Sequence, residues 1–237
     1  MDRISQLVAN NAAWIHEATT ALDIPGEFTA VLWQNAHDMP PIFPNADILG
    51  GTESEQLAAI DALAEARAGR VVAVKDAWAR LDLTSRGFEP LFEADWLYRD
   101  AGPLETVPTD LTLEHIQTAE GLREFSIACN GEVLAEVYSP KLLHRPDITW
   151  IAARRAGKIV AGVTAVFAQG LNGINNLFAA DKSDESHLIR AAVNAYSNVP
   201  ACGYESGDSI TPYLVLGFQT TGQLRVWLKR PPVQQKG

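Results

Sequence analysis

The stretch Tyr213-Leu214-Val215-Leu216-Gly217-Phe218 decides the fold assignment, because its glycine-phenylalanine pair recurs in the first half of the chain. Gly87-Phe88 is followed by Trp96, and Gly217-Phe218 is followed by Trp227. The spacing from glycine to tryptophan is 9 residues in the first case (96 − 87) and 10 in the second (227 − 217). A recurring spaced pattern is typical of two diverged copies of one structural unit.

A second correspondence lies upstream of these pairs. Glu53-Ser54 and Glu185-Ser186 are separated by 132 residues (185 − 53), and the same offset relates two aspartates further along. We therefore predict that residues 50–99 and 183–230 form the same helix-strand-helix-strand unit, with the two tryptophans in equivalent places.

The composition is that of an ordinary globular chain of 237 residues, 47% hydrophobic, with a formal net charge of −10. This length can bury one large core or two modest ones. The negative charge repels a nucleic-acid backbone and an anionic membrane, so we expect neither as a partner and favour a small-molecule or peptide amine. Cys129 and Cys202 are expected to be buried apolar residues rather than disulfide or metal ligands.

No targeting or membrane segment is expected. The chain starts with Met1-Asp2-Arg3 and continues into an amphipathic stretch, and its longest apolar run, Ile159 to Ala168, contains a glycine and a threonine. Neither segment has the length and uniform apolarity of a signal peptide or a membrane span. We expect a cytoplasmic protein that is a monomer or a homodimer.

Hydrophobic periodicity predicts an α/β protein in the first half of the chain. The expected helices are Ile4–Leu22, Gln56–Ala66 and Trp78–Leu83, and the expected strands are Phe28–Trp33 and Arg70–Val74. Phe88–Tyr98 is expected to be a strand or a hairpin, and Ala46–Leu49 is a short apolar run. Ala101-Gly102-Pro103 is the predicted linker. The predicted division is a truncated lobe over residues 1–104, a complete domain over 105–230 and a disordered tail over 231–237.

The second half shows a similar alternation. A short strand and a helix are expected within Leu113–Cys129, a β-hairpin between Trp150–Ala153 and Ile159–Phe167, strands at Leu171–Phe178, Ala201–Tyr204 and Leu224–Leu228, the last after a turn at Thr221-Gly222, and helices at Glu185–Tyr196 and Ser209–Leu216. The order is strand, hairpin, strand, helix, strand, helix, Gly-Phe, strand.

This order over residues 109–230 resembles the GNAT superfamily of N-acyltransferases. In that superfamily the short helix before the last strands often reads Tyr-x-x-x-Gly-Phe, which residues 213–218 match position for position. The hairpin sequence over residues 156–162 is similar to the family's "D/N-G-x-x-V-G" strand pair. The resemblance implies a GNAT-like fold, with a mixed central sheet and flanking helices, and a first half that repeats only the latter part of the fold.

The resemblance implies acyl transfer from acetyl-CoA or another acyl-CoA to the amine of a small molecule or peptide. The residues that it assigns to coenzyme A binding lie on the fourth strand of the domain and at the start of the following helix. They are Asn176, Leu177, Phe178, Lys182, Ser183, Ser186 and His187. A backbone amide of Asn175–Phe178 would polarise the thioester oxygen.

The turn before that helix departs from the family pattern. In the superfamily it reads Arg/Gln-x-x-Gly-x-Gly/Ala, because bare backbone amides must approach the pyrophosphate. Here Ala180-Asp181-Lys182-Ser183-Asp184-Glu185 has neither glycine. A self-capped helix start is the alternative, with Ser183 as the cap and Asp184 and Glu185 facing the helix dipole.

The resemblance also implies catalytic roles. Tyr213 occupies the general-acid position, and Glu205 and Asp208 are candidates for the group that deprotonates the amine. Each has an ordinary structural alternative: Tyr213 as a packed core residue, and either carboxylate, Asp208 above all, as a helix cap. The first half has Leu83 where the second has Tyr213, so it is expected to be a structural lobe. Its loop Pro40–Pro44 would either shape the acceptor cleft or be an ordinary surface loop.

Two other functions are compatible with the sequence. A catalytically inactive protein of the same fold would use the cleft to bind another ligand, as the altered turn suggests. A serine hydrolase is a weaker alternative, because Gly203-Tyr204-Glu205-Ser206-Gly207 has its serine one residue later than the Gly-x-Ser-x-Gly elbow. The sequence has no metal-ligand spacing and no nucleotide-binding fingerprint.

Overall fold

The computed structural model describes residues 2–231, so the predicted tail lies outside the described residues except for Pro231. Five α-helices are present in this part of the chain: α1 Arg3–Ala21, α2 Glu53–Ala66, α3 Ala119–Asn130, α4 Glu185–Ala195 and α5 Thr211–Val215. The strands are β1 Glu27–Phe28, β2 Leu32–Gln34, β3 Ala46–Ile48, β4 Val72–Asp76, β5 Glu89–Arg99, β6 Thr112–His115, β7 Ile148–Arg155, β8 Lys158–Ala168, β9 Leu171–Ala179, β10 Ala201–Glu205 and β11 Gln219–Lys229. None of the helices in residues 2–231 is long and apolar enough to cross a membrane.

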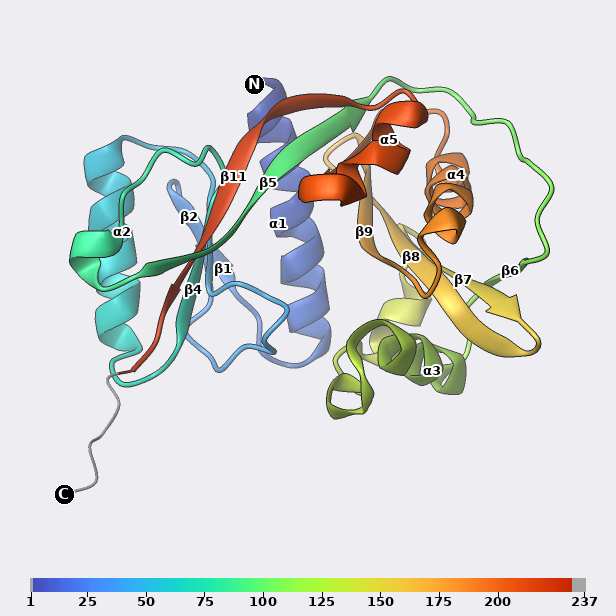
Figure 1. The fold of residues 1–237 in the computed structure, drawn as a ribbon. Helices are drawn as coiled ribbons and strands as arrows, with labels where there is room; N and C mark the ends of the chain where they lie inside the picture. The colour runs from blue at the N-terminus through green and yellow to red at the C-terminus, as the bar shows by residue number, and fades with distance from the viewer. Residues whose placement is uncertain (1, 232–237) are drawn as a thin grey trace.

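All of these strands belong to one sheet with the order β1-β2-β3-β4-β11-β5-β10-β9-β8-β7-β6. Two strands pair with strands from the other half of the chain. β5 pairs antiparallel with β10, and β11 pairs antiparallel with β4, while β5 and β11 pair with each other across the middle. Figure 1 shows these two long strands running side by side between the α2 side and the α4 side of the molecule. Each half of the sheet therefore contains the last strand of the other half of the chain.

The segments β3-α2-β4-β5 and β9-α4-β10-β11 have the same order of elements and the same pairing. In each, a helix joins two parallel neighbours, β3 with β4 and β9 with β10. β5 and β11 are both 11 residues long, and each has one unpaired residue, Leu91 and Thr221. The offset between those two residues is 130 (221 − 91), which is also the offset between the two Gly-Phe pairs (217 − 87). Thr221 is thus a bulge inside β11, and the predicted turn at that point is wrong.

The two Gly-Phe pairs close identical turns. Gly87 and Gly217 have φ of 78° and 84°, a left-handed conformation that glycine adopts without a steric cost. The amide of Phe88 donates to the carbonyl of Leu83 at 3.2 Å, and the amide of Phe218 donates to the carbonyl of Tyr213 at 3.1 Å. The recurring Gly-Phe pair is therefore part of a helix-ending turn.

The predicted equivalence of the two tryptophans is wrong. At the common offset of 130, Trp227 corresponds to Leu97, and Trp96 corresponds to Val226. Trp227 packs in the cluster beneath α2, whereas Trp96 packs in the cluster beneath α1. A shift of one residue along a strand moves a side chain to the opposite face of the sheet. The spacings of 9 and 10 residues therefore place the two tryptophans on opposite faces.

Alternation along the strands places the helices in two layers. Trp96 and Val226 face α1, and their neighbours Leu97 and Trp227 face α4 and α2. In β7, Trp150 packs against α1 and α3. Helices α1 and α3 therefore cover one face, and α2, α4 and α5 cover the other (Figure 1).

Two elements of the first half differ from the prediction. The stretch Phe28–Trp33 is a tight hairpin of β1 and β2, because the Thr29 hydroxyl accepts the amide of Leu32 at 2.9 Å and reverses the chain. The stretch Trp78–Leu83 is not helical. The Asp76 carboxylate accepts the amides of Trp78 and Leu81 at 3.2 and 2.7 Å, which holds these residues in an irregular turn.

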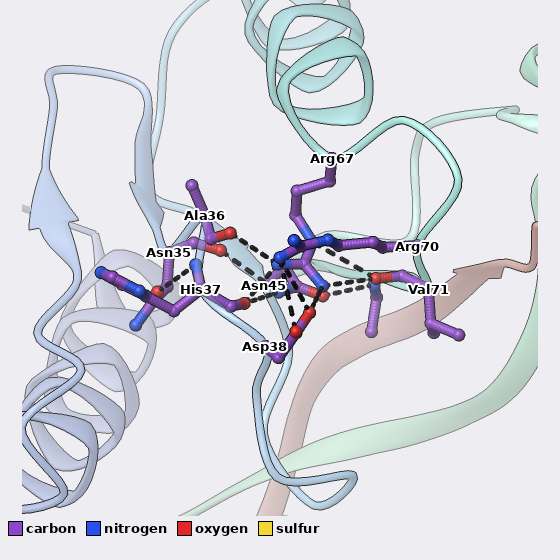
Figure 2. A network of polar contacts seen from close by, with 9 residues as sticks. Asn35, Ala36, His37, Asp38, Asn45, Arg67, Arg70 and Val71 are labelled. Carbon is purple, nitrogen blue, oxygen red and sulfur yellow. Dashed lines mark hydrogen bonds and ion pairs between the residues drawn. The ribbon is translucent and has the colours of Figure 1, made fainter.

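A polar network fixes the segment that leads from β2 to β3 (Figure 2). Arg67, at the end of α2, is 3% exposed and donates to the carbonyls of Ala36 (2.6 Å), His37 and Val71 (2.9 Å). Its ion pair with Asp38 is 3.3 Å long, and that carboxylate is well exposed. A buried guanidinium that donates to backbone carbonyls ties three segments together at one point.

We expect the Arg67→Met substitution to destabilise the protein by about 2–4 kcal/mol, because it removes the buried guanidinium that donates to three backbone carbonyls. Urea unfolding followed by tryptophan fluorescence measures the change. Arg70→Met is the matched control, since Arg70 pairs with the same Asp38 at the surface and its loss should cost about 0.5 kcal/mol or less. Equal effects of the two substitutions would contradict the structural role of Arg67.

Candidate functional site

The parallel ladder between β9 and β10 ends after two residue pairs, Ala201 with Asn172 and Cys202 with Gly173. At the next position, Gly203 lies so near to β9 that a Cβ atom would be 3.1 Å from the carbonyl oxygen of Ile174. In the described part of the chain, residues Ile174–Ala179 of β9 form no pairs with β10, and Tyr204 and Glu205 of β10 form no pairs with β9. The two strands thus separate toward their carboxyl ends, where a binding site is expected in an α/β sheet.

A bulge in β9 lies beside this gap. Its partner strand β8 advances two residues, from Gly162 to Thr164, while β9 passes three, from Phe178 to Asn175. Asn176 has φ of 53°, and its side-chain amide donates to the Thr164 hydroxyl at 3.1 Å. An extra residue in a strand leaves a backbone group outside the ladder. This is the segment in which the sequence predicted a free backbone amide.

A cavity of about 170 Å³ opens at the gap between β9 and β10. Both halves of the chain contribute to it. Its walls are formed by Asn11, Trp14 and Ile15 of α1, Ile42–Pro44 of the proline-rich loop, Lys75 of β4, Ile174–Leu177 of β9, and Tyr204 and Glu205 of β10. The loop that the sequence suggested as a cleft wall therefore lines the same cavity as the predicted Asn176, Leu177 and Glu205.

Glu205 and Tyr213 form an electrostatically coupled group with Glu185. Burial raises the pKa of Glu205 to about 7, and the carboxyl of Glu185 adds to the shift. Tyr213 is 1% exposed and packs edge-on against Phe218. Burial first, and then the carboxyls of Glu205 and Glu185, raise the pKa of Tyr213 well above its usual value. Glu205 can therefore exchange a proton near neutral pH, and Tyr213 stays protonated.

The turn before α4 is held by its own carboxylates. The Asp181 side chain accepts the amide of Ser183 at 2.9 Å, and Asp184 occupies the N-cap position without a capping hydrogen bond. The predicted capping role of Ser183 is therefore wrong. Asp184 is buried and pairs with Arg155 at 3.1 Å, while Lys182 and Ser183 are exposed. Glu185 begins α4, and burial raises its pKa against the attraction of Lys182.

Of the predicted site residues, Asn176, Leu177 and Glu205 line the cavity. Tyr213 does not line it and packs in the cluster beneath α4, and the remaining predicted residues also lie outside it. Phe178 packs edge-on against Phe125 in the core, Ser186 lies in the first turn of α4, and His187 faces a separate cavity under the linker. Asp208 is exposed and caps neither short helix with its side chain, so its predicted capping role is wrong. Ser206 is exposed, and within residues 2–231 no histidine hydrogen-bonds to it, which gives a serine-hydrolase function no support.

Two residues of the cavity wall, Asn11 and Lys75, were not predicted from the sequence. Lys75 is only 3% exposed although it lies in an apolar strand, and Asn11 lies on the buried face of α1. A lysine inside an apolar strand and an asparagine on the apolar face of a helix are unusual, and both were signals in the sequence.

Comparison with known proteins supports the fold. No known family profile matches the chain, and no curated protein matches it. A GCN5-related N-acetyltransferase from Kribbella flavida is similar in structure, with a TM-score of 0.64 and 14% identity over 94% of this chain and 95% of its own. A GNAT-family acetyltransferase from Novosphingobium aromaticivorans gives a TM-score of 0.60 and 12% identity over 97% and 99%. A tandem GNAT protein from the clavulanic acid biosynthesis pathway gives 0.54 and 12% over 80% and 76%. The GNAT-like fold expected from the sequence is confirmed.

Proposed function

We propose that this protein transfers an acyl group from an acyl-CoA to an amine. The observation that carries the proposal is the gap between β9 and β10, which lies beside a bulged strand and ends at a carboxyl group whose pKa is about 7. Open edges of two separated parallel strands offer backbone groups to an extended chain such as pantetheine. The confirmed fold, in which acetyltransferases occur, makes this activity the natural one to test.

The described residues fit the two ends of the cofactor unequally. Asn176 and Leu177 line the cavity where the thioester would lie. At the start of α4, Lys182 and Ser183 are the exposed groups that would meet the phosphates, and the nearby carboxylate of Asp184 is already paired with Arg155. Glu185 lies in the first helical turn and competes for the helix dipole, so we expect weak coenzyme A binding.

When bound, the acyl-CoA would supply the acyl group and the sulfur leaving group. Glu205 would accept the proton that the attacking amine gives up, either directly or through a water molecule. Tyr213 would donate its phenolic proton to the departing sulfur, and the proton held by Glu205 would then restore the phenol. These two residues are suited to opposite tasks, because one titrates near pH 7 and the other stays protonated.

A second function is a catalytically inactive protein that binds a ligand in the same cleft. The carboxylates at the start of α4 favour it, because they occupy the place where a phosphate would gain most from the helix dipole. Both functions use the cavity beside Glu205, and they differ in whether an acyl-CoA is bound and consumed.

Thermal unfolding with acetyl-CoA and longer acyl-CoAs tests the proposal. At 100 times Kd a ligand adds about 2.7 kcal/mol to the stability, which for a chain of this size raises the Tm by several degrees. Addition of an amine mixture should then release free thiol. Acetyl-pantetheine, which lacks the pyrophosphate of acetyl-CoA, is the matched control for phosphate binding. We expect it to bind only slightly more weakly than acetyl-CoA. No shift and no thiol release with any acyl-CoA would end the enzymatic proposal, and a shift without thiol release would favour the inactive binder.

A further inference from the structure

One part of the cavity wall is built largely by the first half of the chain. Lys75 of β4 and Asn11 of α1 line it together with Asn175 of β9. Lys75 is 3% exposed, and its ammonium also lies 4.9 Å from the centre of the Tyr204 ring. Burying a cation at the wall of a small cavity costs free energy unless the cation is paired and hydrogen-bonded. The groups around the Lys75 ammonium therefore indicate which kind of ligand the cavity can bind.

The hydrogen bonds among these three residues run in one direction. The Lys75 ammonium donates to Oδ1 of Asn11, and Nδ2 of Asn11 donates to Oδ1 of Asn175 at 3.5 Å. Because an ammonium cannot accept a hydrogen bond, the Asn11 side chain must present its oxygen to Lys75 and its nitrogen to Asn175. This fixes the direction of the series of hydrogen bonds. Both amide oxygens are used. Nδ2 of Asn175 is buried and has no hydrogen-bond partner within residues 2–231.

Asp47 is the counter-charge of the Lys75 ammonium. The Asp47 carboxylate of β3 lies 3.7 Å from Nζ of Lys75, which is an ion-pair distance rather than a hydrogen bond. Burial disfavours the charged form of Lys75, but Asp47 and Tyr204 together outweigh it, and the pKa of Lys75 is raised. The ammonium has three N–H groups, one of which donates to Asn11 while the others lie near Asp47 and Tyr204, so the donor of this wall without a partner within residues 2–231 is Nδ2 of Asn175, beside the cation.

We propose that Lys75, Asn11 and Asn175 bind a carboxylate of the acceptor, so that the acceptor is a small amino acid or a related amino-carboxylate. A carboxylate has about four acceptor positions and no donor, which complements a wall of N–H donors around a cation. Glu205, on the same cavity, would receive the amine. The volume of about 170 Å³ is small for a ligand pocket and suits one short amino acid. This inference rests on the proposed acyl transfer.

Matched acceptors test the inference on the parent protein with acetyl-CoA. We compare leucine, leucinamide and isopentylamine, with rates expressed per free-base amine so that differences in amine pKa do not enter. We expect kcat/KM for leucine to exceed that for isopentylamine by about 10- to 100-fold, the effect of a hydrogen-bonded charged group, with leucinamide between them.

The Lys75→Met/Asp47→Asn double variant removes the cation and its counter-charge together, so no unpaired buried charge is left. We expect it to lower kcat/KM for leucine by about 10- to 100-fold and to change that for isopentylamine by less than about threefold. Asn175→Ala, which removes the free donor alone, should act in the same direction. Lys141→Met is the control, because Lys141 pairs with Asp23 at the surface.

The outcomes separate this inference from the proposed function. Equal use of the three acceptors, or an equal loss for all of them in the double variant, would overturn the carboxylate site while transfer stands. A loss of acetyl-CoA affinity in Asn175→Ala with unchanged acceptor preference would assign the donors to the cofactor and also overturn it. If no acceptor is used at all, the proposed acyl transfer fails. A rise in Tm of the parent protein with leucine but not with isopentylamine, absent in the double variant, would still support the carboxylate site. The absence of that rise would overturn the site as well.

Discussion

The Glu205→Gln variant is expected to lose about 10²- to 10⁴-fold in kcat, the range typical of losing a general base, with little change in acyl-CoA affinity. In the parent, the deprotonated carboxyl is the active form and its pKa is about 7. The rate per free-base amine should therefore fall tenfold per pH unit below 7, and this limb should be absent from the residual activity of the variant. Initial rates of thiol release between pH 5.5 and 8.5 measure both effects.

The stability of the same variant shows whether a loss of activity comes from misfolding. The folded-state pKa of Glu205 lies above the ordinary glutamate value of 4.5, so folding favours the protonated form, and ionisation costs stability that grows as the pH rises from 4.5 through about 7. A neutral glutamine avoids this cost, so at pH 8 the variant should unfold at the same or a higher urea concentration than the parent.

Asp208→Asn is the matched control, because Asp208 is the other carboxylate at the end of β10 but is exposed and lies outside the cavity. Its rate should stay within about twofold of the parent rate, as for surface substitutions away from a site. A folded Glu205→Gln protein with the parent pH profile would exclude Glu205 as the base, and a large loss in Asp208→Asn would restore the alternative that the sequence left open.

Local chemistry explains what the sequence predicted well. The Gly-Phe turns, the helix α2 and the strand β9 depend on residues within a few positions of each other. The side chain of Thr52 and that of Glu55, for example, cap the start of α2 reciprocally. The irregular turn after β4 was missed because a carboxylate at Asp76 binds two backbone amides there, and an apolar periodicity does not reveal such bonds.

The exchange of β5 and β11 could not be predicted, because the two strands belong to equivalent units. Each has 11 residues, one bulge and alternating apolar faces, so each offers a similar edge to either half of the sheet. The choice depends on contacts between residues more than 100 positions apart, such as Val74 with Trp227. The same long-range packing brings Lys75 to Glu205, and a pattern within one segment cannot show that.

The Tyr213→Phe variant is expected to lower kcat by about 10²- to 10⁴-fold and to leave the Kd of acetyl-CoA nearly unchanged, because only the phenolic hydroxyl is removed. Within residues 2–231 no side chain or backbone group hydrogen-bonds to that hydroxyl, and the ring still packs against Phe218. The loss of stability should therefore be below about 1 kcal/mol. Single-turnover rates and calorimetric titration measure the first two quantities, and urea unfolding measures the third.

Tyr138→Phe separates a catalytic hydroxyl from a buried one. Tyr138 is also buried, and its hydroxyl accepts a hydrogen bond from Asn130 at 3.4 Å, so its removal should cost about 1 kcal/mol and leave the rate unchanged. The two substitutions are then expected to have opposite signatures, one in rate and one in stability. A Tyr213→Phe protein that transfers at the parent rate would show that Tyr213 is a core residue, and because Glu205 acts on the amine rather than on the sulfur, that result would leave the role of Glu205 intact.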